Sequence, residues 1–211
     1  VLKNIDLSIK SGEKIGVYGA AGSGKSTLLS LLAGQYKPTS GQIFYDDIEL
    51  KQWAIGRIRK QSAWLAQNPS LFYGSILENI LAGNHQVAPQ TLAKAINLSG
   101  INQFIDRLEA GLESQVGEFG RCLSGGQRQA VVIARALVRD ARIMFLDEPC
   151  SAMDEQTERH LIKTFKEITH TTMIIASHKP SVLSLCNRII VMDKGSISTI
   201  KTPQELFAQP T

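Results

Sequence analysis

Short apolar runs that end at a polar or glycine residue recur along the chain and predict buried strands. Residues 15–18, 143–146 and 173–176 are such runs, and continuous apolar character is typical of parallel strands covered on both faces. Between the last two, residues 155–168 carry an apolar stripe of period near 3.6, which predicts an amphipathic helix. Strands that alternate with helices predict an α/β fold with a mostly parallel sheet.

Weaker patterns fill the rest of the chain. Residues 5–9 alternate between apolar and polar positions and predict a first strand, and residues 42–45 predict another. Residues 46–61 are polar and irregular, so no regular element is expected there. Residues 189–200 hold two strand-like runs around Lys194 and Gly195, which predicts a hairpin.

Residues 75–107 change to helical spacing, and no repeat or low-complexity segment interrupts them. We therefore expect one domain over residues 1–211, with an α/β core made of residues 1–67 and 141–211. Residues 68–140 are expected to form an inserted all-α subdomain.

Composition narrows the class of protein. The 211 residues are 43% hydrophobic and 20% charged, which is enough for a substantial core. The three cysteines have no metal-ligand spacing, as expected in a reducing compartment such as the cytoplasm. No apolar run approaches the roughly 18 residues of a membrane helix. The chain starts at Val1 and enters strand-like alternation directly, so we expect an excised piece of a longer protein.

Charge does not favour a nucleic-acid partner. The formal net charge is +4, but the basic residues are spread along the chain and form no block.

The strongest chemical signal is GAAGSGKS at residues 19–26, between a predicted strand and a predicted helix. A glycine-rich turn at a helix N-terminus aligns backbone N–H groups around a polyphosphate. Lys25 would reach the β- and γ-phosphates, and the Ser26 hydroxyl would join the shell of Mg²⁺. The alternative is a glycine-rich loop that caps a helix and binds nothing.

Two acids end the buried strand at residues 143–146. Asp147 would hold Mg²⁺ opposite Ser26, and Glu148 could act as general base toward an attacking water. Taken alone, the pair could equally be two exposed acids in a turn.

A second glycine-rich helix start, LSGGQ at residues 123–127, offers another anion site. Taken alone it could be an ordinary helix cap. The chain already has a complete phosphate loop, however, so a second anion site would need a separate function.

These motifs together resemble the nucleotide-binding domain of ABC transporters over essentially the whole chain. GAAGSGKS is similar to the Walker A, LSGGQ to the family signature, and IMFLDEP at residues 143–149 to the Walker B. SAMD at residues 151–154 is similar to the D-loop, Gln67 to the Q-loop glutamine and His178 to the switch histidine. The resemblance implies a P-loop NTPase (RecA-like) core with a small antiparallel β part.

The resemblance also implies the site residues. It makes Glu148, His178 and Lys25 catalytic, and Ser26, Gln67 and Asp147 ligands of Mg²⁺. The implied ATP-binding residues are Gly19, Ala20, Ala21, Gly22, Ser23, Gly24, Lys25, Ser26, Thr27, Gln67, Ser124, Gly125, Gly126, Gln127 and Asp154. Two such domains would dock head to tail as a homodimer, so that Ser124 of one chain faces the phosphate held by Lys25 of the other.

Within the family, residues 114–120 (SQVGEFG) and 71–80 (LFYGSILENI) resemble exporter segments, most like type I secretion or peptide exporters. This implies export of a protein or peptide, a transmembrane domain fused upstream, and a place on the cytoplasmic face of the bacterial inner membrane. Cys150 and Met153 depart from the common Thr and Leu. The aromatic residue that stacks on adenine would lie upstream of Val1.

Three alternatives stay open. One is a soluble ABC ATPase that acts on nucleic acid or ribosomes, without a membrane partner. Another is a stand-alone importer ATPase subunit, and the third is a module that binds nucleotide without turnover. The intact set Asp147, Glu148 and His178 argues against the third.

Overall fold

The computed structural model describes residues 1–68, 70–84 and 86–208, and the chain divides into two compact units. The α/β unit comprises Val1–Trp64, Ala141–Glu148 and His170–Thr211; the helical unit comprises Leu65–Asp140 and Pro149–Thr169. Residues 149–169, which the sequence assigns to the core, therefore cluster with the helical unit. The predicted domain boundaries stay a prediction.

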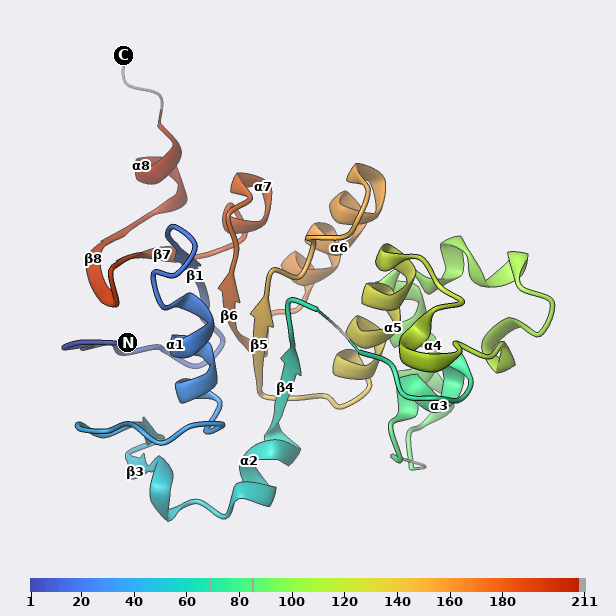
Figure 1. The fold of residues 1–211 in the computed structure, drawn as a ribbon, viewed down its shortest axis with the longest axis horizontal. Coiled ribbons are helices and arrows are strands. Elements are labelled where there is room, and N and C mark those ends of the chain that lie inside the picture. Colours follow the sequence, from blue (N-terminus) through green and yellow to red (C-terminus); the bar gives the residue numbers. More distant parts are fainter. Residues whose placement is uncertain (69, 85, 209–211) are drawn as a thin grey trace. The chain divides into compact units, whose positions relative to one another are not determined.

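A six-stranded sheet forms the centre of the α/β unit, in the order β4-β5-β6-β1-β7-β8 (Figure 1). Neighbours from β5 through β7 pair in parallel, and β8 pairs antiparallel with β7. The strands are β1 (Lys14–Tyr18), β4 (Ser62–Leu65), β5 (Ile143–Asp147), β6 (Thr172–Ala176), β7 (Arg188–Asp193) and β8 (Ser196–Lys201). The predicted α/β fold with a mostly parallel sheet and a C-terminal hairpin is confirmed.

Helices cover both faces of this sheet, as the alternation along β1 requires. Ile15 and Val17 pack in one cluster with Leu28 and Leu29 of α1 (Lys25–Leu32). Gly16 faces the other way, and a Cβ there would meet Leu183 of α7 (Pro180–Leu183). On that second face Tyr18 meets Phe207 of α8 (Pro203–Phe207) edge to face, with ring centroids 6.4 Å apart. The phosphate-loop segment thus leaves a strand that is packed from both sides.

Two predictions for the N-terminal third are wrong. Residues 5–9 form no strand; their apolar side chains pack against the core cluster, but the backbone joins no sheet ladder among the described residues. Residues 46–61 are regular rather than irregular, with β3 (Ile48–Glu49), a 3₁₀ turn (Leu50–Gln52) and α2 (Ile55–Gln61). Only Ile58 of α2 is buried, and a single buried position leaves no periodic signal in the sequence. β2 (Phe44–Tyr45) pairs antiparallel with β3, giving the small antiparallel part.

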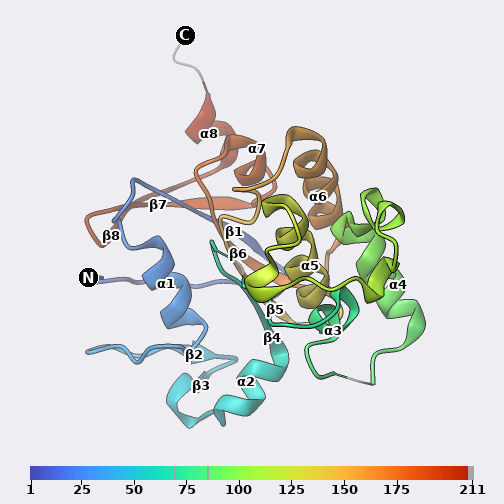
Figure 2. The same ribbon diagram turned by 45° about the vertical axis from the view of Figure 1, so that its right-hand side comes forward.

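The helical unit is built around α5 (Gly125–Leu137), which contacts α3 (Ile76–Leu81) and α4 (Pro89–Ser99). α4 in turn contacts α6 (Glu155–Glu167), as Figure 2 shows. Seven of the thirteen residues of α5 are buried, so this helix is the core of the unit. Short 3₁₀ turns connect the helices at Ile101–Gln103, Ile105–Arg107, Gly111–Glu113 and Glu118–Gly120.

A buried polar network joins α5 to the segment before α3. Arg135 donates from Nε to the Asn79 carbonyl at 2.7 Å and from Nη2 to Asn79 Oδ1 at 2.9 Å. The Asn79 amide donates to the carbonyls of Phe72 and Ser75, and the guanidinium lies over the Phe72 ring. Burial lowers the pKa of Arg135. Since each of these groups is satisfied by another, the network fixes the 72–75 segment on α5.

No helix within the described residues is long and apolar enough to cross a membrane.

Candidate functional site

The loop between β1 and α1 has a backbone that only glycine tolerates well. Gly19, Gly22 and Gly24 have φ of 155°, 79° and 103°, in the region that side chains rarely enter. A Cβ on Gly19 would overlap the carbonyl oxygen of Met192. The predicted glycine positions therefore shape the loop, and a pocket of about 220 Å³ opens beside it, lined by Val1, Gly22, Gly24, Lys25, Ser26 and Thr27.

This loop presents unsatisfied donors, which suits an anionic ligand. α1 has no side-chain cap among the described residues, so its first N–H groups are left for a ligand. Ser23 is 5% exposed, and its Oγ has no hydrogen-bond partner in the described part of the chain. Lys25 Nζ donates to the carbonyls of Gly19 and Ala20 at 2.7 and 3.0 Å. The lysine thus lies folded across the loop, and a polyphosphate would fit the remaining donors.

Asp147, the last residue of β5, lies against the start of α1. Burial raises the pKa of its carboxyl; a hydrogen bond from Ser26 opposes the shift, the charge of Glu148 adds to it, and the charge of Lys25 opposes it. The Ser26 hydroxyl and the Asp147 carboxylate are hard oxygen ligands that meet at one point, as Mg²⁺ requires. No cluster of three or more His, Cys, Asp or Glu side chains that could hold a metal occurs among the described residues. The residues present therefore fit an ion that is also held by phosphate and water.

Glu148 follows directly and is held from three sides at the edge where β5 and β6 end. Its backbone N–H donates to the Ala176 carbonyl at 2.9 Å, and its φ of 50° is unusual for a residue with a side chain. Its Oε1 lies 2.9 Å from Nδ1 of His178, and its Oε2 accepts from Ser177 Oγ at 3.3 Å. The carboxylate is 9% exposed and the imidazole 65% exposed. The structure thus brings together Glu148 and His178, which the sequence places 30 residues apart.

The signature segment of the helical unit forms a helix start with a reciprocal cap. Ser124 Oγ accepts from the Gln127 N–H at 3.2 Å, and Gln127 Oε1 accepts from the Ser124 N–H at 2.9 Å. Cβ atoms on Gly125 and Gly126 would each come within 3.2 Å of Ala152, so the glycines let residues 151–154 approach α5 closely. Ser124 is thus an ordinary cap and also an exposed hydroxyl at a helix start.

Two further predicted site residues lie in the same unit. Asp154 caps α6 by accepting from the Thr157 N–H, and this bond lowers the pKa of its carboxyl. Gln67 is exposed and follows β4. Because Gln67, Ser124 and Asp154 belong to the helical unit and the phosphate loop to the α/β unit, their roles at the nucleotide stay predictions.

Sequence reasoning assigned no role to Ser177. The sequence feature that could have indicated a role is its position directly after a buried strand. β5 and β6 pair in parallel with Asp147 opposite Ala176. The next residue of each strand, Glu148 and Ser177, must then meet at the same edge.

Comparison with known proteins decides the family. The family model described as ABC transporter matches residues 2–151. The chain belongs to the ABC transporter family. It is 39% identical to the ATP-dependent lipid A-core flippase of Chromohalobacter salexigens over 99% of this chain and 36% of that protein. It is also 39% identical to the alpha-hemolysin translocation ATP-binding protein HlyB of Escherichia coli, over 100% of this chain and 30% of that protein.

A solved structure of a bacterial Atm1-family ABC exporter with ATP bound superposes with a TM-score of 0.88 at 32% identity. It covers 93% of this chain, and this chain covers 35% of it. The predicted P-loop NTPase fold and the predicted ABC ATPase domain are confirmed. The chain spans about a third of the length of the relatives it matches.

Proposed function

We propose that this ABC domain is the ATP-hydrolysing motor of an exporter. Its relatives include a flippase and a hemolysin translocator at equal identity, so the cargo is left open, the predicted protein or peptide included. The observation that carries the proposal is the carboxyl edge of the sheet, where Asp147 meets Ser26 and Glu148 meets His178. Hydrolysis of a phosphoanhydride uses one acid that holds the metal ion and a second that activates water. Asp147 and the buried Glu148 provide this pair beside the phosphate loop.

Each residue has a distinct part in the proposed reaction. The loop of residues 19–27, which includes Lys25, would hold the phosphates. Ser26 and Asp147 would hold Mg²⁺, which would supply positive charge against the phosphate oxygens. Glu148 accepts the proton of the attacking water. His178 orients the Glu148 carboxylate through the 2.9 Å contact and, being largely exposed, is free to turn toward the γ-phosphate.

A second copy of the chain completes the proposed site. Ser124, Gly125 and Gly126 form an exposed or half-buried helix start in the helical unit, and such a start favours an anion. With Gln127 and Asp154 beside them, they would face the phosphates held by the partner copy. Gln67 would then report on Mg²⁺ and on the membrane partner.

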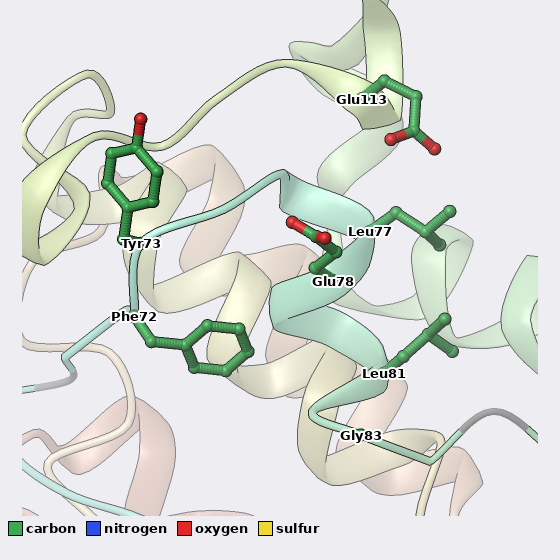
Figure 3. Close-up of a pocket in the computed structure, with 7 residues that line it drawn as sticks. All are labelled: Phe72, Tyr73, Leu77, Glu78, Leu81, Gly83 and Glu113. Atoms are coloured by element: carbon green, nitrogen blue, oxygen red, sulfur yellow. The ribbon is translucent and has the colours of Figure 1, made fainter.

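The remaining two thirds of the relatives' length suggests a transmembrane partner, fused in the full-length protein, at the cytoplasmic side of the membrane. Its proposed docking point is a pocket of about 330 Å³ in the helical unit (Figure 3). Phe72 and Tyr73 at its rim are 45% and 76% exposed, which favours an apolar partner segment. Glu78 and Glu113 also line it, so we expect a basic residue on that segment.

The test combines turnover with assembly. In Glu148→Gln, ATP hydrolysis should fall by at least about a hundredfold, because the base is lost while every phosphate contact remains. Light scattering of this variant should show a monomer that becomes a dimer when ATP and Mg²⁺ are added.

Asp193→Asn is the control, because Asp193 is likewise an acid at the end of a sheet strand but is exposed. It should hydrolyse ATP like the parent chain. Normal hydrolysis by Glu148→Gln would contradict the assignment of the base. A persistent monomer that still binds ATP would contradict the proposal that two copies of this chain form the site together.

The alternatives predicted from sequence gain no support. The relatives named above are a flippase and a translocation protein, and none of the observed features favours nucleic acid, ribosomes or an importer.

A further inference from the structure

Ser177 is a buried hydroxyl that the proposed reaction does not yet use. It is 1% exposed and directly follows β6, opposite the end of β5. Its backbone N–H donates to the Val17 carbonyl of β1 at 3.2 Å. Main-chain bonding to the central strand therefore fixes where its side chain starts.

The bonds of the hydroxyl define where its single proton points. Ser177 Oγ accepts a hydrogen bond from the Lys179 N–H at 3.2 Å. Among the described residues, the other hydrogen-bond partner of the hydroxyl is Glu148 Oε2 at 3.3 Å, which can only accept when ionised. The hydroxyl proton is therefore directed at Glu148.

The two oxygens of Glu148 are thus held in different ways. Oε1 meets His178, whose side chain is 65% exposed, whereas Oε2 meets a serine that is almost completely buried. An exposed imidazole can turn away on the side-chain timescale, but a buried hydroxyl anchored by two backbone bonds cannot. When His178 leaves, the Ser177 bond still fixes the plane of the carboxylate.

We infer that Ser177 is the positioning residue of the proposed base: it holds Oε2 of Glu148 so that Oε1 stays turned toward His178 and the attacking water. This rests on the proposed function, in which Glu148 is the base. Ser177 touches neither nucleotide nor water in this role and acts only through Glu148. A carboxylate held in this way needs no reorganisation during reaction.

The primary test is the steady-state kinetics of Ser177→Ala in the 211-residue chain. Loss of a hydrogen bond to a charged group predicts a kcat lower by roughly ten- to hundredfold. KM for ATP should stay within about twofold, because no phosphate contact changes. Ser177→Thr keeps the hydroxyl and should restore kcat to within about threefold of the parent chain. In a Glu148→Gln background, Ser177→Ala should lower the residual rate no further.

Ser99→Ala is the matched control, since Ser99 is also 1% exposed and its hydroxyl donates to a backbone carbonyl in the helical unit. It should leave kcat unchanged. An unchanged kcat in Ser177→Ala would overturn the inference. A fall in kcat together with ATP affinity, without rescue by Thr, would overturn it as well, since that pattern indicates a structural defect.

A second readout does not depend on turnover. Denaturant unfolding of Ser177→Ala, Glu148→Ala and the double variant should show that the two changes in midpoint are not additive, whereas Ser99→Ala and Glu148→Ala should add. Additivity of the first pair would overturn the Ser177 contact. Normal hydrolysis by Glu148→Gln would instead overturn the proposed base, so the two failures are distinguishable.

Discussion

The phosphate-loop edge of the α/β unit and the signature helix of the helical unit are both anion sites in the proposed function, but they are built differently. At the first, Asp147, Glu148 and His178 come from strand ends that sheet register brings together. At the second, Ser124 and Gln127 cap their own helix over three residues.

In the proposed function, the first region carries the groups that react and the second only binds an anion. The sheet edge carries a carboxylate with a raised pKa, and a contact between the buried Glu148 carboxylate and His178. Both require a tertiary scaffold to exist. The signature carries only backbone N–H groups and a hydroxyl, which a local cap can present. Variants should therefore damage binding and turnover at the first region, and local stability and assembly at the second.

The largest effect is expected at the phosphate loop. Lys25→Ala removes the one charged donor of this loop and should weaken ATP binding roughly a hundredfold, as measured by equilibrium titration with a fluorescent ATP analogue. Lys60→Ala, an exposed lysine of α2, is the control and should bind like the parent chain. Equal affinity for all three proteins would remove Lys25 from the site.

Asp147→Asn should raise the stability of the nucleotide-free chain and reduce the stabilisation that ATP and Mg²⁺ provide. Burial raises the pKa of Asp147, so the folded state holds this proton more tightly than the unfolded state does. The ionised carboxylate therefore lowers stability at neutral pH, and stability of the parent chain should rise as pH falls through the raised pKa. Without nucleotide, the Asn variant should melt higher than the parent chain at pH 7 and lack this pH response.

With ATP and Mg²⁺ at a hundred times the dissociation constant, the parent chain should gain about 2.7 kcal/mol, and Asp147→Asn should gain much less. Thermal melts from neutral pH down to the ordinary aspartate pKa of 3.8 check both points. A variant that melts lower than the parent chain without nucleotide would refute the sign of this argument.

In the helical unit, Arg135→Ala should lower the free energy of unfolding by about 2 kcal/mol, because Asn79 loses both guanidinium bonds and its buried Oδ1 keeps only the Phe72 N–H as donor. Arg159→Ala is the matched control on α6; its pair with Glu155 is exposed and worth at most about 0.5 kcal/mol. Chemical denaturation compares the two. Equal effects would mean that the Arg135 network adds nothing beyond a surface charge.

Ser124→Ala should cost about 1 kcal/mol through loss of the cap and leave ATP binding by the monomer unchanged. Thr202→Ala removes an equivalent capping box from α8 and should cost a similar amount. Only Ser124→Ala, combined with Glu148→Gln, should weaken the ATP-dependent dimer. If Thr202→Ala weakened it equally, the proposed role of the signature in assembly would be refuted.

The smallest effect concerns the ion pair of Glu13 and Arg188. Burial alone would raise the pKa of Glu13, but hydrogen bonds from Arg188 and from the Lys10 N–H outweigh it, so the pKa is lowered. The stability from this pair is present above the ordinary pKa of 4.5 and is lost as pH falls below it. Glu13→Gln should cost less than about 1 kcal/mol at pH 7, and its difference from the parent chain should vanish in acid melts.

Much of the fold could be predicted because its signals are local. Continuous apolar runs marked β1, β5 and β6, and the glycine pattern marked the loop that needs positive φ at Gly19, Gly22 and Gly24. The failures occurred where local signals are weak. Residues 5–9 alternate like a strand but have no ladder partner among the described residues, and α2 buries a single residue.

What the sequence alone determined is therefore the set of chemical groups: the phosphate loop, the two acids after β5, and a signature helix that caps itself through neighbours three residues apart. Only the tertiary structure decided which of these groups meet. Parallel register sets Glu148 beside Ser177 and His178, and packing of β5 against α1 sets Asp147 beside Ser26. The physical reason is the sequence separation of the interacting groups. A helix cap or a glycine turn involves residues that are close in the chain. The contact of Glu148 with His178, 30 residues later, depends on the register of the whole sheet.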